Sequence, residues 1–305
     1  MIRSLFSAVS GLTAHQTAMD VIGNNISNVD TYGFKSSEAQ FGQAFVQNAR
    51  LPTTSTPIGE DIGLGTRIEG TVTDWGQGSF KQTGVPSDVG ISGNGLFAVN
   101  TAPTASAGST VYTRAGNFVV DVNGYLRTAD GYYVQGTTGT GTSNGFGTAL
   151  TSTFTQPTAP TGAVSDASLS NIQIPTSVFN TTTGTTLSTN GNYAIGTNGA
   201  VTVTDSAGAS YVVGFLTLST VTNESGLNDQ GQGYYTTTAA SGSAVNYQAN
   251  TNNAGSTNAG SLEISNADVA TQFSDMIIIQ RGYDANAKVI TTSSEMLQTV
   301  INMVQ

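Results

Sequence analysis

Apolar residues recur at every seventh position along the C-terminal end of the chain. They are Val269, Met276, Tyr283, Ile290, Leu297 and Val304. A seven-residue apolar repeat keeps one stripe of a helix facing a partner along its whole length. The spacing therefore predicts a helix over about residues 268–304, which would be roughly 55 Å long at 1.5 Å per residue. A helix of this length needs another helix to lie against.

The N-terminal end carries a second apolar stripe with the same spacing. Its members are Leu5, Leu12, Met19 and Ile26. Two such stripes at opposite ends of a chain favour terminal helices that pack together, or that pack onto the same helices of neighbouring copies. The alternative is that each stripe is buried in the chain's own core. We predict that the two stripes form a self-assembly seam.

The composition limits the partners of the chain. Only 9% of the 305 residues are charged, the formal net charge is -10 and the pI is about 4.2. These values argue against binding to a nucleic-acid backbone or an anionic membrane. The chain has no cysteine, so we expect neither a disulfide framework nor a thiolate metal site. No apolar run approaches the roughly 18 residues of a membrane-spanning helix, so we expect no membrane insertion.

The segment after the first helix contains residues that end helices and form turns. Asn, Asp and Gly within residues 24–35 indicate a helix end followed by a turn. Residues 36–50 are expected to form a short helix that carries Phe41 and Phe45 on one face. The prolines and glycines of residues 51–65 indicate an extended connector.

The middle of the chain has the signals of antiparallel strands. Asn123 and Gly124 lie between two apolar runs. This dipeptide is the strongest short-range signal of a hairpin, because both positions must accept positive φ. A second turn at residues 129–131 predicts another strand, so residues 117–135 are expected to form a meander within a strand region over about 66–136.

These signals together predict an α+β fold. Long N- and C-terminal helices form a coiled-coil inner domain, with an inserted all-β domain and a small Thr/Gly-rich insertion. The expected segments are an N-terminal helix over 1–30, an extended connector over 31–75, the first part of the β domain over 76–136, a small and partly mobile insertion or outer domain over 137–190, the second part of the β domain with a linker over 191–260, and a C-terminal helix over 261–305.

The residues that catalytic and metal sites require are scarce in this sequence. The only histidine is His15, on the expected first helix, where a packed helix offers no cleft for a Ser-His-Asp device. One histidine without cysteine does not make a zinc site. Asp121, Asn123 and Asp130 lack the spacing of a calcium loop and are expected to be turn residues.

Phosphate and sugar chemistry have no clear signal either. Two isolated Gly-x-Gly pairs, at residues 63–65 and 93–95, lack the strand-turn-helix context of a nucleotide cradle. Paired carboxylates for glycoside hydrolysis stay an open alternative, because any two of the 19 acidic residues could meet in space. We therefore predict that the chain is not an enzyme and has no catalytic residue, no cofactor and no metal.

Four motifs, in order along the chain, carry a family resemblance. They are residues 24–35 (NNISNVDTYGFK), 84–97 (GVPSDVGISGNGLF), 112–118 (YTRAGNF) with the turns that follow, and 262–269 (LEISNADV) with 276–281. The chain resembles the bacterial flagellar rod and hook proteins. The resemblance assigns the family's N-terminal signature to Asn24, Asn25, Asn28, Gly33, Phe34 and Lys35.

Residues 289–302 are most similar to the hook protein, and the distal rod protein is the close alternative. Asp284, Gly23 and Asp30 depart from the usual family residues, and the chain is short for a hook protein. The resemblance implies a structural subunit of the hook, which self-assembles into a tubular helical filament and acts as a flexible torque-transmitting joint. A distal rod subunit would instead form a stiff drive shaft. A secreted β-rich adhesin is a third, less favoured alternative.

The resemblance also implies partners and a location. The chain is expected to form a homopolymer and to meet flagellar rod and hook-filament junction proteins, the hook cap and the type III export apparatus. Its place would be the extracellular hook or the basal body. Polar residues break the apolar stretch of the first 16 residues, so we expect export without a cleaved signal peptide.

Overall fold

The computed structural model describes the greater part of the chain. The described residues are 2–50, 60–102, 110–138, 159–160, 162–164, 168–175, 177–180, 185–188, 192–204, 206 and 208–304. Contacts within the chain define two compact units. Unit 1 consists of Met1–Val29, Lys35–Gly76 and Asn266–Gln305, and unit 2 consists of Asp30–Phe34 and Gln77–Ser265. The chain therefore crosses between the units four times.

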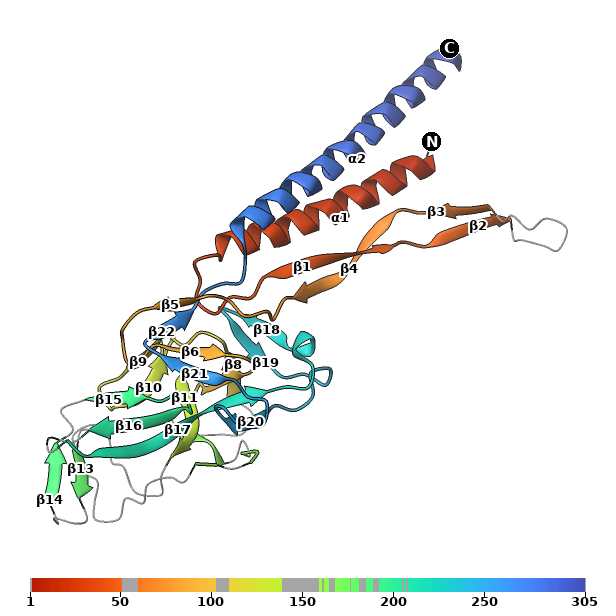
Figure 1. Cartoon of the computed structure of the whole chain (residues 1–305). Coiled ribbons are helices and arrows are strands. Elements are labelled where there is room, and N and C mark those ends of the chain that lie inside the picture. Colours follow the sequence, from red (N-terminus) through yellow and green to blue (C-terminus); the bar gives the residue numbers. More distant parts are fainter. Residues whose placement is uncertain are drawn as a thin grey trace. The chain divides into compact units, whose positions relative to one another are not determined.

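Unit 1 combines two long helices with paired strands. Its elements are α1 (Ile2–Ser27), β1 (Ser37–Gln43), β2 (Val46–Arg50), β3 (Glu60–Gly63), β4 (Thr66–Thr73) and α2 (Val269–Val304). The 36 residues of α2 agree closely with the helix predicted from the seven-residue repeat. Figure 1 shows α1 and α2 side by side, with the N-terminus of α1 and the C-terminus of α2 at the same end.

The two helices run antiparallel, and three contacts fix their register. Asn25 Nδ2 donates a 2.9 Å hydrogen bond to Gln272 Oε1. Farther along the pair, Gly282 lies against His15, and Gly11 lies against Asn286. Residues 25, 15 and 11 of α1 thus face residues 272, 282 and 286 of α2. The residue numbers fall on one helix as they rise on the other, which defines an antiparallel pair.

The strands of unit 1 form a ribbon that is visible in Figure 1. β1 pairs antiparallel with β4, with an irregularity between Gln40 and Phe41, and β2 pairs antiparallel with β3. The expectation of a short helix over residues 36–50 is wrong. Phe41 and Phe45 are four residues apart, which also suits a helix, but pairing with residues 60–73 decides the backbone. Most of the expected connector, residues 51–59, lies outside the described residues.

Unit 2 is built almost entirely from strands. They are β5 (Phe80–Gln82), β6 (Val89–Ser92), β7 (Leu96–Asn100), β8 (Thr110–Thr113), β9 (Phe118–Val120), β10 (Leu126–Thr128), β11 (Tyr133–Thr138), β12 (Ser170–Asn171), β13 (Ser177–Asn180), β14 (Thr185–Ser188), β15 (Tyr193–Ile195), β16 (Ala200–Thr204), β17 (Ser210–Thr220), β18 (Asn228–Gly231), β19 (Tyr234–Thr236), β20 (Val245–Gln248), β21 (Ser256–Ala259) and β22 (Ser261–Glu263). A short 3₁₀ helix, η2, spans Glu224–Gly226.

One large antiparallel sheet organises unit 2. Its main path among the described strands is β15-β16-β17-β11-β7-β8-β19-β18. The longest strand, β17, also pairs with β20 and β7. Beneath the sheet lies a continuous core in which Phe97 and Phe118 meet edge-on, with ring centroids 5.0 Å apart. Apolar residues that alternate along these strands account for this core, because successive side chains of a strand point to opposite faces.

The turns of the middle region join strands as predicted, but Asn123 does not take the positive φ that was expected of it. β9 and β10 pair as a hairpin, with Leu126 opposite Val120, and Gly124 has a φ of 81°. Gly131, with a φ of 90°, then leads toward β11, which pairs with β10. The β meander predicted from these turns is confirmed. Much of the expected insertion over 137–190 lies outside the described residues.

The overall class is α+β, as predicted, with two terminal helices and a large β-rich unit. Residues 246–260, expected to be a linker, instead contribute strands to unit 2. β20 extends the edge of the large sheet beside β17, and β21 pairs with β6. These polar strands have no strong local signal, and their partners lie far away in the sequence.

Candidate assembly interface

The face of α1 that packs in unit 1 is made of small residues. Its buried positions are spaced by three or four: Ala8, Gly11, Ala14, Ala18 and Ile22. A methyl group added at Gly11 would lie 2.7 Å from Asn286 Nδ2. The absence of side-chain bulk along this face lets the two helix backbones approach closely.

His15 packs inside the helix pair. A methyl group added at Gly282 would lie 2.8 Å from His15 Cε1, so Gly282 makes room for the imidazole ring. On its other side the ring lies 5.3 Å from the Phe41 ring, centroid to centroid. His15 is therefore a packing residue between α1, α2 and β1.

The predicted seam residues lie beside the small-residue face. On α1, Leu5, Leu12, Met19 and Ile26 are half-buried; on α2, Met276, Tyr283 and Ile290 are half-buried, Val269 and Leu297 are exposed, and the side chain of Val304 lies outside the described part. The buried face of α1 thus uses alanine and glycine more than the heptad residues. Whether the seam residues join neighbouring copies stays a prediction.

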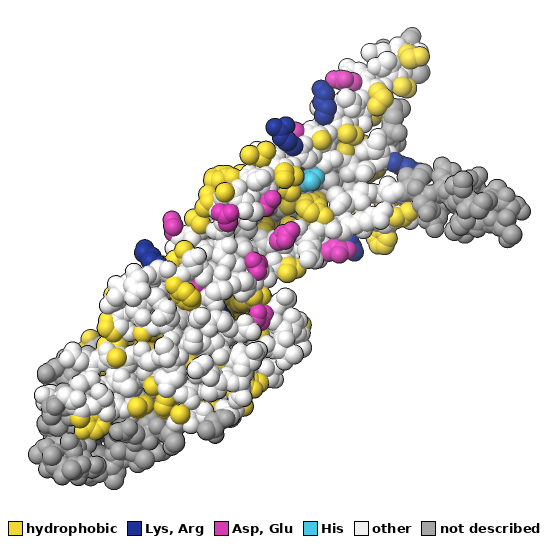
Figure 2. Space-filling view, in the orientation of Figure 1, with side chains coloured by type: hydrophobic (Ala, Val, Ile, Leu, Met, Phe, Trp, Pro, Cys, Tyr) yellow, Lys and Arg dark blue, Asp and Glu magenta, His cyan; other side chains and the backbone are white. Residues whose placement is uncertain are grey.

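The C-terminal end of α2 extends past the start of α1. Because residue 11 faces residue 286 in this antiparallel pair, Ile2 falls near residue 295. The following turns of α2 therefore have no part of α1 beside them. They carry Met296, Leu297, Val300, Ile301 and Met303, which are 38–81% exposed. We call residues 296–303 the α2 overhang. Figure 2 shows hydrophobic side chains along the helix pair up to this end.

The ribbon of unit 1 also exposes apolar side chains. Phe45 is 83% exposed, and Phe41, Val46 and Val72 are each about 40% exposed. An isolated two-stranded ribbon is only marginally stable in water. Together with the α2 overhang, the ribbon gives unit 1 more exposed large apolar side chains than a solitary chain needs, which is typical of an interaction surface.

Asn25, one of the signature residues, joins three elements of unit 1. It is 2% exposed. Its Nδ2 donates to the Ser37 carbonyl oxygen at 2.8 Å and to Gln272 Oε1 at 2.9 Å, and its Oδ1 accepts from the Ser37 N–H at 3.0 Å. One buried amide thus ties the end of α1 to the start of β1 and the first turn of α2.

Two other signature asparagines complete the end of α1. Asn28 Nδ2 donates to the Asn24 carbonyl oxygen at 3.0 Å and to Asn24 Oδ1 at 2.8 Å. The last carbonyl groups of a helix have no intrahelical partner. The Asn24 carbonyl oxygen already accepts the Asn28 N–H at 3.1 Å, so the Asn28 side chain adds a second hydrogen bond near the end of α1.

The remaining signature residues hold the turn after α1. Gly33 has a φ of 69°, and a methyl group there would lie 2.6 Å from the Ala115 nitrogen in unit 2. Phe34 is half-buried. Lys35 is 2% exposed, and its Nζ donates to the Gly76 carbonyl oxygen at 2.7 Å in unit 1. Each of these residues stabilises the chain close to a crossing between the two units.

Two clusters of hydrogen bonds, which the sequence did not predict, hold the other segments where the chain crosses between the units. In unit 2, Glu263 accepts from Arg114 Nε at 2.7 Å and from the Gly78 N–H at 2.9 Å, and both charged side chains are buried. In unit 1, Asn266 accepts from the Ser36 N–H at 2.8 Å and donates to the Asp74 carbonyl oxygen at 2.8 Å. The low content of charged residues, 9% of the chain, could have drawn attention to Arg114 and Glu263, because each charged residue is unusual in this sequence.

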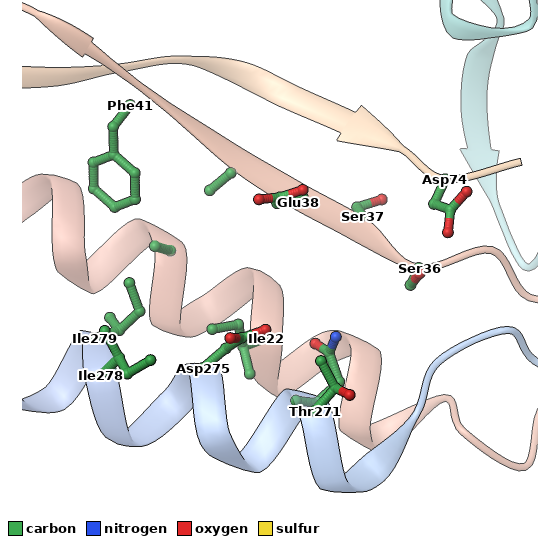
Figure 3. A pocket seen from close by; sticks show the side chains of 13 residues that line it. Ile22, Ser36, Ser37, Glu38, Phe41, Asp74, Thr271, Asp275, Ile278 and Ile279 are labelled. Carbon is green, nitrogen blue, oxygen red and sulfur yellow. The ribbon is translucent and has the colours of Figure 1, made fainter. Parts of the chain in front are cut away.

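A cavity of about 390 Å³ opens within unit 1 between the ribbon and the helices. Ala18, Ile22, Ile278 and Ile279 supply apolar groups from α1 and α2. Figure 3 shows the Phe41 ring pointing from β1 toward the helices at one end of the cavity. The rim carries three carboxylates, which belong to Glu38, Asp74 and Asp275. We call this cavity the α1-α2-β1 groove.

The N-terminus of α2 is capped by an acidic side chain. Asp268 precedes Val269, accepts from the Thr271 hydroxyl at 2.7 Å and accepts from the Ala270 N–H at 3.2 Å. The Thr271 hydrogen bond, with the help of the Ala270 N–H, holds the pKa of Asp268 below its usual value. Donors near the carboxylate favour its charged form, so the cap is a charged one.

The perturbed side chains of unit 2 do not suggest catalysis. Burial raises the pKa of Tyr235 to about 12 and raises the pKa of Tyr234 further. Both phenols are therefore neutral, and Tyr234 donates to Asp130 Oδ2 at 2.7 Å. Within the described ranges, no three His, Cys, Asp or Glu side chains gather where they could hold a metal ion. The described helices include none that is long and apolar enough to cross a membrane.

Comparison with known families identifies the class of protein. Residues 5–35 match the family model "Flagella basal body rod protein". Residues 90–203 match "Flagellar hook protein FlgE/F/G D1 domain", and residues 258–303 match "Flagellar basal body rod FlgEFG protein C-terminal". These ranges contain the signature residues, much of the large sheet of unit 2 and almost all of α2.

Individual relatives match along the whole chain. The chain is 34% identical to the flagellar basal-body rod protein FlgG of Bacillus subtilis and 32% identical to that of Agrobacterium fabrum, with at least 98% of each chain covered. It is 27% identical to the flagellar hook protein FlgE of Salmonella typhimurium over 417 aligned positions, covering 98% of this chain and 100% of the hook protein. The chain belongs to the flagellar rod and hook protein family, a structural family of the bacterial flagellum.

Proposed function

We propose that this chain polymerises with copies of itself into an axial tube of the flagellum, as a distal-rod type of subunit. The observation that carries the proposal is the large exposed apolar surface of unit 1, on the α2 overhang and on the ribbon. Apolar surface of this extent is stabilised when a neighbouring copy covers it. A contact between different surfaces of successive copies does not close on itself and builds a helical filament.

Two observations favour the rod over the hook. The rod proteins among the relatives match end to end over 305–310 positions, whereas the hook protein FlgE needs 417 positions and so contains segments that this chain lacks. The exposed ribbon provides a contact between copies in addition to the helices, and each added contact resists sliding of one subunit past another. Resistance to sliding suits a stiff shaft.

The hook is the second candidate function. Residues 289–302 resemble the hook protein, as the sequence analysis set out. A hook has to bend as it turns, and the Thr, Ser and Asn residues of this chain would make polar contacts that exchange with water at little net cost. In either function, torque passes through the packed helices. The neighbours we propose are rod and hook-filament junction proteins, the hook cap and the type III export apparatus.

The shape of the polymer tests the choice between rod and hook. Purified chain would be concentrated under polymerising conditions and imaged by electron microscopy. Straight, rigid tubes of uniform diameter are the expected result. Curved or supercoiled tubes would favour the hook instead, and a chain that stays monomeric at high concentration would contradict both functions.

Leu297→Asp tests the role of α2 in assembly. Leu297 is 38% exposed in the single chain, so a carboxylate there stays in water and should leave the monomer folded. In an assembled interface the same carboxylate would be buried without a partner, which costs several kcal/mol. We expect loss of polymer by sedimentation with unchanged circular dichroism. The matched control is Gln298→Asp, which adds the same charge at a polar neighbour; equal effects of the two variants would argue against a specific seam.

A further inference from the structure

We propose that the α1-α2-β1 groove of one subunit receives the α2 overhang of the next subunit. The proposal rests on the proposed function, because it names a contact through which the copies join. The groove is thus occupied by a second copy of this chain.

The α2 overhang carries an apolar stripe that could insert into a groove of another subunit. Leu297, Val300 and Ile301 are spaced by three and four, so they form one stripe on the helix surface. Their exposed fractions are 38%, 46% and 60%. No α1 residue faces this part of α2, and an amphipathic helix end without a packing partner gains little stability in water. The stripe therefore requires a partner that the rest of its own helix pair does not supply.

The groove matches this stripe in size, and the isoleucines on its helix side match it in polarity. An apolar cavity of about 150 Å³ accommodates a benzene ring. The groove, at about 390 Å³, has room for two or three branched aliphatic side chains. Ile22, Ile278 and Ile279 line it on the helix side, and the Phe41 ring lies at its end. Filling it with aliphatic groups would remove apolar surface from water on both subunits.

The overhang brings no like charge to the acidic rim of the groove. The groove rim carries Glu38, Asp74 and Asp275. Residues 296–303 have no charged side chain, so inserting them brings no carboxylate to this acidic rim. Glu295 lies at the base of the overhang, outside the inserted stripe. Arg3 is exposed on α1 beside the base of the overhang, where it can approach a rim carboxylate of the next copy.

The α2 overhang cannot reach the α1-α2-β1 groove of its own chain. Ile278 lines the groove, and Val300 lies 22 residues farther along the same straight helix, which corresponds to roughly 33 Å. A disulfide bridges Cα atoms that are no more than about 7 Å apart. Any bond between the groove and the overhang must therefore join two copies, and a disulfide is a direct test of the contact.

The experiment uses the full chain, whose lack of native cysteine leaves no background reaction. The variant Ala39→Cys/Val300→Cys places one thiol in the groove and one on the overhang. Polymer of this variant would be oxidised, denatured and separated without reducing agent. We expect a ladder well beyond dimers, because each copy links to the next, and mass spectrometry should identify the linked peptides around residues 39 and 300.

The matched control is Gln40→Cys/Val300→Cys. Gln40 neighbours Ala39 on β1, but successive side chains of a strand point to opposite faces, and Gln40 does not line the groove. This control should yield no linked peptides between positions 40 and 300. Polymer that forms normally without a 39–300 link, or with residue 39 linked to another segment, overturns the groove contact and leaves the proposed function intact. Absence of any wild-type polymer overturns both.

A blocking variant gives an independent measurement. Ala39→Trp fills the groove, so the concentration required for polymerisation should rise at least about tenfold, because an overpacked site rejects further side chains. Gln40→Trp adds the same indole to the opposite face and should change that concentration little. Similar values for Ala39→Trp and the wild-type chain, with both folded by circular dichroism, would contradict the proposal.

Discussion

At the scale of single residues, the family signature is explained by backbone geometry and buried polar groups. Asn25 is buried at low cost because its amide makes three hydrogen bonds that join three elements. Lys35 is buried because its ammonium group finds the Gly76 carbonyl oxygen. The Arg114–Glu263 ion pair is buried in unit 2 and bonds two backbone segments, at the Gly95 carbonyl oxygen and the Gly78 N–H. Removing one partner of such a pair typically costs about 3–5 kcal/mol.

Gly33→Ala should destabilise unit 2 by more than the cost of backbone strain alone. The φ of 69° costs an alanine about 1–2 kcal/mol, and the new methyl group would also overlap the Ala115 nitrogen. Gly84→Ala is the matched control, since Gly84 has a φ of 71° but open space around it. Denaturant unfolding of both variants would measure the difference. Equal losses of unfolding free energy would mean that the close approach of Gly33 is unimportant.

At the scale of elements, unit 1 depends on helix ends and on a small-residue contact. The buried face of α1 consists largely of Ala8, Gly11, Ala14 and Ala18, so this face buries little apolar area for its length. The capped start of α2 therefore matters, because a helix with limited packing relies more on its terminal hydrogen bonds. The ribbon also depends on contacts with other elements, since two paired strands alone are only marginally stable in water.

The start of α2 should loosen in acid. The pKa of Asp268 is held low in the folded chain, so the folded state favours the carboxylate. Its stabilising contribution is complete above the unfolded pKa of about 3.9 and is lost as the pH falls through the lower folded value. Hydrogen exchange of the first turn of α2 between pH 5 and pH 2 would measure this change. Asp268→Asn keeps a capping side chain but cannot titrate, so it should remove this part of the pH dependence; an unchanged profile would contradict the assignment.

At the scale of the whole molecule, the two units differ in how they are stabilised. Unit 2 has a continuous core that includes Phe97, Phe118, Leu216 and Leu218. Unit 1 keeps many of its large apolar side chains at its surface. The proposed assembly with neighbouring copies would supply the burial that unit 1 lacks.

Unfolding of dilute monomer should therefore proceed in two steps, with unit 1 first. Apolar burial sets most of the stability of a unit, and unit 2 has the larger core. Helical circular dichroism would report the loss of α1 and α2, and tyrosine fluorescence would report unit 2. Limited proteolysis should trim both termini before it cleaves residues 192–204 or 210–220. Coincident transitions by both probes would show that the units unfold together.

The amino-acid sequence by itself determined the features that arise from local spacing. The seven-residue repeats produced the long α2, and Asn123-Gly124 produced the β9–β10 hairpin, because helix periodicity and turn chemistry act between near neighbours. The motifs also identified the family. Only the tertiary structure decided that residues 37–50 pair with residues 60–73 as a ribbon, because strand pairing depends on a distant partner. It also decided that alanine and glycine, more than the heptad residues, form the buried face of α1, since the residues that a helix buries depend on its register with its neighbours.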